Sequence, residues 1–189
     1  MQGKISLLIL AFLTVAVSPK GYSPSTRSGA QDMNRRLVFL GEFSNIRFTE
    51  EHAYGVSVEL WQSGNSVFGL LDFADGLQGD TPTGLLQDAA FDPVSGRVSF
   101  KARLTVGLHY CRQHWNVPSR DLFEFSGKLR EAMLTGNLTR SDALHPEHKA
   151  RTERVLLKRT EELAPIQAAS YLEWKREVDT ILKIRGPKW

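Results

Sequence analysis

The chain of 189 residues carries 24 Lys and Arg residues, 21 Asp and Glu residues and a single cysteine, Cys111. Because 41% of the residues are hydrophobic and 10% are aromatic, the chain can fill a folded core, which excludes a globally disordered protein. One cysteine forms no internal disulfide and builds no zinc site of several cysteines.

The first 18 residues have the pattern of an export signal. Lys4 precedes an almost uninterrupted apolar run from Ile5 to Val17. A helix over this run would reach about 20 Å, short of a hydrocarbon core of about 30 Å, so we interpret residues 1–18 as a signal peptide. We expect a secreted or periplasmic protein with no transmembrane span in its mature form. Because Pro19 disfavours cleavage, the alternative is a protein anchored by an uncleaved N-terminal segment.

Residues 19–35 are rich in Ser, Pro and Gly and show no apolar periodicity, which predicts a flexible tether. Residues 36–162 show the period of two that is typical of β-strands. The predicted strands are 37–49, 54–62, 66–75, 84–92, 97–106, 121–130, 132–142 and 150–160.

Short turns separate these strands, for example Ser63-Gly64-Asn65, where Gly and Asn tolerate positive φ. Consecutive antiparallel strands joined by short turns form a meander, and eight of them can close into a barrel. We therefore expect an all-β fold, namely an eight-stranded antiparallel up-and-down β-barrel with a C-terminal α-helix. A sandwich of two four-stranded sheets is the alternative.

A short motif on the first predicted strand points to a family. Gly41-Glu42-Phe43 is similar to the Gly-x-Trp signature of the lipocalins, with Phe in place of Trp. A basic residue on the last strand, Arg154 or Arg159, would pack across that ring as the arginine of the family does. On these residues the chain resembles the calycin-type barrels, the group of lipocalins and avidins. The resemblance implies a barrel with a ligand cavity and a helix packed against its outer surface.

Residues 163–189 are predicted to contain an amphipathic helix that follows Pro165 and ends before Gly186-Pro187. Apolar residues recur there at spacings of three, four and three, which places them on one helix face. These residues are Tyr171, Trp174, Val178 and Ile181. We expect this face to dock on the outside of the barrel; the alternative is a free helix that binds a partner or a membrane surface.

The charges are unevenly distributed along the predicted barrel. Residues 42–92 contain nine acids and one base, a net charge of −8, whereas residues 97–159 contain 13 bases and six acids, a net charge of +7. In a meander the two halves of the sequence lie on opposite sides of the barrel. We therefore expect an acidic wall and a basic wall, which either pair with one another across the closure or orient the protein on a charged partner.

Two segments combine residue types that ligate metals: His109-Tyr110-Cys111-Arg112-Gln113-His114 and His145-Pro146-Glu147-His148. Neither has the spacing of an established zinc motif, and both lie in predicted loops. We expect solvated loops there, with no metal site and no cofactor.

The leading functional expectation is an exported, non-enzymatic β-barrel that binds a small apolar or amphipathic ligand or a protein partner. Nucleic acid is not expected as a partner, because no short basic run is interleaved with aromatic residues. One face of the strands would line the ligand cavity. The candidate lining residues are Val56, Val58, Leu60, Val98, Phe100, Ala102 and Leu104.

Two alternatives remain open. A barrel enzyme acting on a lipid-like substrate would need an ionisable residue inside the barrel, for which Asp72, Asp88 and Glu124 are the candidates. A structural or inhibitory exported protein would act through its outer surface or its C-terminal helix.

Overall fold

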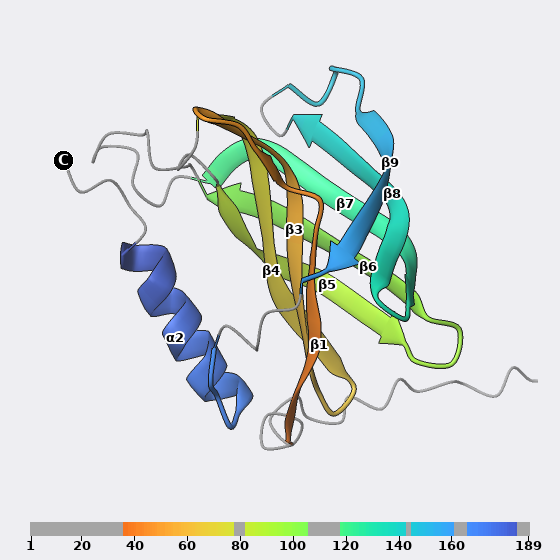
Figure 1. The fold of residues 1–189 in the computed structure, drawn as a ribbon, viewed down its shortest axis with the longest axis vertical. Coiled ribbons are helices and arrows are strands. Elements are labelled where there is room, and N and C mark those ends of the chain that lie inside the picture. The colour runs from red at the N-terminus through yellow and green to blue at the C-terminus, as the bar shows by residue number, and fades with distance from the viewer. Residues whose placement is uncertain (1–35, 78–81, 106–117, 143–144, 161–165, 185–189) are drawn as a thin grey trace, which may run out of the picture.

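The computed structural model describes residues 36–77, 82–105, 118–142, 145–160 and 166–184 (Figure 1). The predicted signal peptide and tether lie outside these residues. The described elements are β1 (Leu37–Ser44), β2 (Arg47–Phe48), β3 (His52–Ser63), β4 (Ser66–Leu77), β5 (Thr83–Asp92), β6 (Arg97–Thr105), β7 (Pro118–Arg130), β8 (Met133–Asp142), β9 (Arg151–Arg159) and α2 (Tyr171–Ile184).

The sheet closes on itself. The strands pair in the order β1-β9-β8-β7-β6-β5-β4-β3, and β1 also pairs with β3, which completes an eight-stranded antiparallel barrel. The two-residue strand β2 pairs with β3 beside this ring. The predicted all-β barrel with a C-terminal helix is therefore confirmed, and each predicted strand corresponds to one strand of the barrel.

The first predicted strand, 37–49, is interrupted after Ser44. The Ile46 amide donates to the Ser44 hydroxyl at 3.1 Å, and the Val56 amide donates to the Asn45 side-chain oxygen at 2.8 Å. Side chains thus take the place of ladder hydrogen bonds at this point, as Ser and Asn often do. The interruption separates β1 from β2.

The closure between the first and last strands is short. β1 and β9 are in register only at Phe43 with Arg159 and at Ser44 with Lys158. The rest of β9, residues 151–157, pairs with β8, and no described strand pairs with its other edge. Figure 1 shows β9 diverging from β1 toward its N-terminal end. The barrel is therefore closed at one end and separated along this seam at the other.

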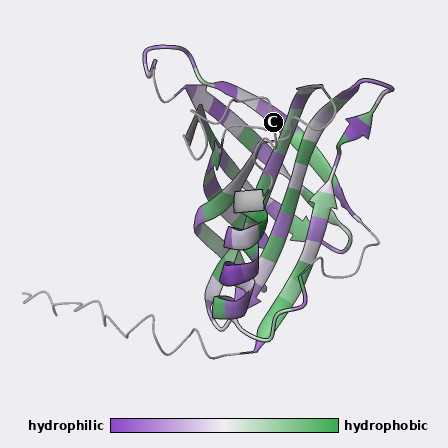
Figure 2. Cartoon of the chain, turned by 90° about the vertical axis from the view of Figure 1, so that its left-hand side faces the viewer, coloured by the Kyte–Doolittle hydropathy of each residue, from purple (hydrophilic) through white to green (hydrophobic). Residues whose placement is uncertain are grey.

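Alternate residues of the strands point inward and form one core. The hydrophobic and hydrophilic bands along the strands in Figure 2 show this alternation. The buried residues of this core are Phe43, Val56, Val58, Leu60, Leu71, Leu86, Val98, Phe100, Ala102, Leu104, Phe123, Phe125, Leu134, Leu138, Val155 and Leu157. All seven predicted lining residues are among them.

A second core lies outside the barrel, where α2 packs against β3 and β4. Its buried members are Trp61, Phe68, Leu70, Ile166, Trp174 and Val178. Two further residues of the predicted helix face, Tyr171 and Ile181, pack against this core. The helix thus docks on the barrel, as expected. In the described part of the chain, no helix has the length and apolar character needed to cross a membrane.

The described helix begins at Tyr171, after an irregular segment that starts at Ile166. The Glu173 amide donates to the Ser170 hydroxyl at 3.3 Å, and the Glu173 carboxylate accepts a hydrogen bond from the Ala169 amide at 2.8 Å. This arrangement resembles a capping box, in which a Ser and a Glu three residues later satisfy free amides at a helix start. The capping residues therefore fix where the helix begins.

Candidate functional site

An ionic cluster lies inside the barrel at the end where β9 diverges from β1. Arg140 follows the buried Leu138 by two residues on β8 and points into the same interior. Its guanidinium donates to Asp121 on β7 at 2.9 Å and to Asp75 on β4 at 3.3 Å. It also lies 4.9 Å from the centre of the Phe73 ring. Arg140 therefore connects strands on opposite sides of the barrel mouth.

The charge of Arg140 is held in place by its two acidic partners. Partial burial disfavours the charged guanidinium, but the hydrogen bonds and charges of Asp121 and Asp75 outweigh this effect and raise the pKa of Arg140. The cluster of one guanidinium and two carboxylates therefore places a fixed polar group at the barrel mouth.

A cleft of about 430 Å³ opens beside Arg140. Its apolar surface comes from Val56, Phe73, Ala74, Phe123, Leu138 and Val155, and its polar surface from Asn45, Tyr54, Asp75, Arg140, Arg151, Glu153 and Arg154. Residues of β3 and β9, the strands that are not paired at this end, line it together. The volume lies within the usual range of small-molecule sites, about 300–1,000 Å³. The separated seam therefore gives access to an amphipathic cleft.

The predicted lining residues are all inside the barrel, and one of them, Val56, lines this cleft. The other six are Val58, Leu60, Val98, Phe100, Ala102 and Leu104, each no more than 2% exposed in the core. Their contact with a ligand stays a prediction. Arg140 was not among the predicted site residues. It is separated by even numbers of residues from Leu134 and Leu138, and this alternation predicts that its charge faces inward.

The three candidates for an interior catalytic group lie on the outside of the barrel. Asp72 follows the buried Leu71 and accepts a hydrogen bond from the Thr83 hydroxyl on the outer face. Asp88 is exposed and forms an ion pair with Lys101 at 3.4 Å. Glu124 is exposed between the inward-facing Phe123 and Phe125. These three carboxylates therefore do not supply the interior group that the enzyme alternative requires; the ionisable residues of the cluster inside the barrel mouth are Arg140, Asp75 and Asp121.

The acidic and basic halves of the sequence form opposite walls of the barrel, as their order in the sheet requires (Figure 1). The Asp75–Arg140 pair links them across the mouth at 3.3 Å, and the Asp88–Lys101 pair links them at neighbouring strands. Part of the opposite charge is thus paired within the barrel, in agreement with the expectation that the acidic and basic walls pair with one another.

A partly buried carboxylate lies between the barrel and α2. The indole groups of Trp61 and Trp174 both donate to one oxygen of Glu59, the latter at 3.3 Å. Burial raises the pKa of Glu59, the two indole hydrogen bonds lower it, and the charges of Glu42 and Asp72 raise it; the net change is upward. The carboxyl of Glu59 therefore keeps its proton to a higher pH in the folded protein than in the unfolded chain.

Replacing Glu59 by glutamine should leave stability unchanged at about pH 4 and increase it at about pH 7. The stability that a carboxyl with a raised pKa contributes is fully present below its ordinary pKa of 4.5 and is lost as the pH rises through the raised value. Glutamine keeps an acceptor oxygen for both indoles but never acquires the charge. Urea unfolding at the two pH values measures the difference.

The Glu124→Gln variant is the control for this measurement, because it removes an exposed carboxylate from the outer face of β7. A Glu59→Gln variant that is less stable than the wild type at both pH values would show that the indoles hold the carboxyl as an anion.

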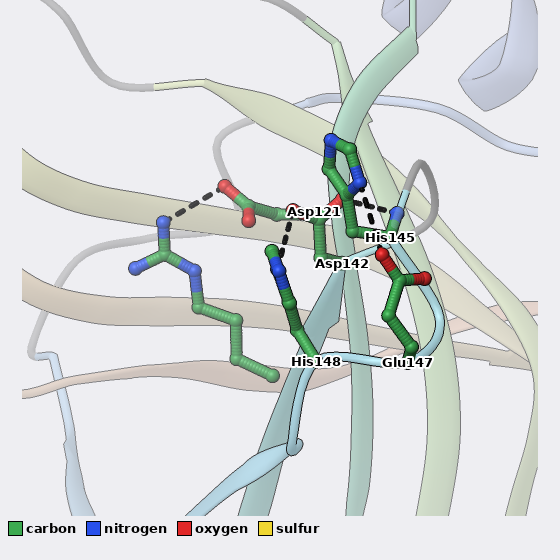
Figure 3. Close-up of polar contacts among 6 residues, drawn as sticks. Asp121, Asp142, His145, Glu147 and His148 are labelled. Carbon is green, nitrogen blue, oxygen red and sulfur yellow. Dashed lines mark hydrogen bonds and ion pairs between the residues drawn. The ribbon is translucent and has the colours of Figure 1, made fainter.

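Of the two histidine-containing segments, 109–114 and 145–148, only the second lies within the described residues. His145 to His148 lie in the connection between β8 and β9, near Asp121, the partner of Arg140 (Figure 3).

The aromatic–arginine contact implied by the family resemblance is present with Arg159. Its guanidinium lies 4.9 Å from the centre of the Phe43 ring. Gly41 has φ +132°, and a Cβ atom there would lie 2.3 Å from Nη1 of Arg159, so this close approach requires glycine. Arg154 points to the opposite face of β9, since it is offset from Arg159 by an odd number of residues.

Comparison of the chain with protein families, curated proteins and solved structures found no match. The closed eight-stranded barrel is compatible with a calycin-like fold.

Proposed function

We propose that the protein is a divergent calycin-type barrel that binds a small amphipathic ligand in the cleft at its mouth. The observation that carries this proposal is the cleft beside Arg140, whose lining combines apolar side chains with three arginines, one aspartate and one glutamate. The contact of Arg159 with Phe43, the glycine at position 41 and the helix on the outer surface support the family assignment. The protein acts by binding, in an exported compartment, without catalysis.

The charges of the cleft favour an anionic group on the ligand. Arg140 already shares its charge with Asp75 and Asp121. Arg151, by contrast, is in phase with the inward-facing Val155 and has no ion-pair partner among the residues that the structure describes. A carboxylate or sulfonate at the rim would meet this cation, while the apolar part of the ligand contacts Phe73 and its neighbours.

The anionic dye 1-anilinonaphthalene-8-sulfonate provides a test, because its fluorescence increases in apolar sites. We expect saturable binding of one dye per chain. Replacing the exposed Glu153 by tryptophan should fill the cleft and abolish binding, whereas Glu153→Gln should preserve it. Arg151→Gln should weaken binding by about 2- to 5-fold, the value of an exposed ion pair.

The matched control is Lys128→Gln, which removes an exposed cation from the outer face of β7 and should leave dye binding unchanged. Near-ultraviolet circular dichroism verifies that each variant keeps its tertiary packing. Binding that does not saturate, or that survives Glu153→Trp, would overturn the proposal.

A further inference from the structure

The connection between β8 and β9 brings two imidazoles and a carboxylate into one small cluster, shown in Figure 3. Candidate ligand atoms of His145, Glu147 and His148 all lie within 4.8 Å of one another. Nδ1 of His145 is 3.3 Å from Oε1 of Glu147, and the two imidazole rings stack with centres 5.0 Å apart. The cluster thus holds three groups of the types that ligate transition metals.

Backbone hydrogen bonds hold this turn in place. The His148 amide donates to the His145 carbonyl at 2.9 Å, and the His145 amide donates to Oδ1 of Asp142 at 3.2 Å. Pro146, between the two histidines, fixes its own φ in the range that a turn requires. Because these bonds are donated by backbone amides, they hold the turn without using the ring nitrogens of His145 and His148.

We propose that His145, Glu147 and His148 bind a divalent transition metal ion of the zinc class. Two ligand atoms at bond lengths of about 2.0–2.1 Å around a tetrahedral ion are about 3.3 Å apart, which is the separation of His145 Nδ1 and Glu147 Oε1. The three side chains are between 53% and 67% exposed, so an ion from solution can reach them and keep a water molecule as its fourth ligand.

A fourth residue supports the site from behind. Oδ2 of Asp142 lies 3.9 Å from Nδ1 of His148, and the Asp142 side chain is only 16% exposed. At 3.9 Å this contact is an ion pair, and a carboxylate that closes to hydrogen-bond distance of a ligating imidazole fixes the orientation of the ring and makes it a better ligand. Asp142 is therefore assigned as a positioning residue. The sequence pattern alone indicated a solvated loop here, because it does not show that these side chains converge.

Zinc titration of the full, untagged chain by calorimetry tests this proposal, which does not rest on the proposed ligand cleft. We expect uptake of one ion at this site, lost in His145→Ala and in His148→Ala. Asp142→Asn should weaken it by about 10- to 100-fold, as for other residues that orient metal ligands. In NMR spectra, zinc should shift the imidazole signals of His145 and His148 and leave those of His52 unchanged.

The control separates this cluster from the other histidine segment. A variant with His109→Ala, Cys111→Ser and His114→Ala should retain the uptake. Absence of zinc uptake in the wild-type chain, or uptake that both hairpin variants retain, would overturn the proposal. All substituted hairpin ligands are exposed, so the variants should keep the barrel fold, which circular dichroism verifies.

Discussion

Replacing Trp174 by alanine should lower the free energy of unfolding by about 3–5 kcal/mol, the usual cost of removing a buried aromatic side chain. The Trp174 side chain is 1% exposed at the centre of the core between α2 and the barrel. Its ring centre lies 4.7 Å from that of Phe68, and its indole donates to Glu59. Alanine would leave a cavity and remove one of the two indole donors to a partly buried carboxylate.

Leu172→Ala is the matched control, since Leu172 is 57% exposed on the same helix and alanine is a good helix former. Its effect should be within about 0.5 kcal/mol. Denaturant unfolding followed by tryptophan fluorescence and circular dichroism measures both variants. Equal stability of the two variants would mean that the helix contributes little to the fold, which would favour its alternative role as a free partner-binding element.

Replacing Phe43 by alanine should cost a similar amount, about 3–5 kcal/mol, for a different reason. Phe43 is fully buried in the barrel interior and is one of only two β1 residues in register with β9. Its ring also supports the Arg159 guanidinium, a cation–π contact worth about 0.5–1 kcal/mol at an exposed site. The substitution therefore removes core packing at the place where the barrel closes.

Phe48→Ala provides the comparison, because Phe48 is also an aromatic residue near this seam but is 66% exposed. It should change stability by less than about 0.5 kcal/mol. Equilibrium unfolding gives both values, and amide hydrogen exchange should show the largest loss of protection for Phe43→Ala in β1 and β9. A small, uniform effect would indicate that the barrel does not depend on this closure.

The strands could be predicted from sequence because each buries one face, and residues such as Val98, Phe100 and Ala102 alternate regularly with polar or charged ones. The closure could be expected from the number of strands, but its extent could not. Pairing of Phe43 with Arg159 is a contact between opposite ends of the barrel sequence, and local periodicity carries no information on register at that distance.

The candidate sites were harder to predict than the fold. The core residues could be predicted from the alternation of apolar and polar residues. Arg140 shares this alternation, but its charge does not distinguish it from the other basic residues between positions 97 and 159. Glu59 occupies an outward position, and only the docking of α2, far along the chain, buries it. The Ser170 to Glu173 spacing was a local signal for the helix start that could have been read directly.

The short seam between β1 and β9 has a consequence for how the protein is made. Synthesis proceeds from the N-terminus, and domains form as their segments emerge. The strands from β1 to β8 can pair with their neighbours early, but the ring stays open until Arg159 reaches Phe43. Until then both outer strands present unpaired edges that invite association with other chains. The last strand, β9, therefore closes the barrel. A nascent chain without it is an open, association-prone sheet and not a smaller barrel.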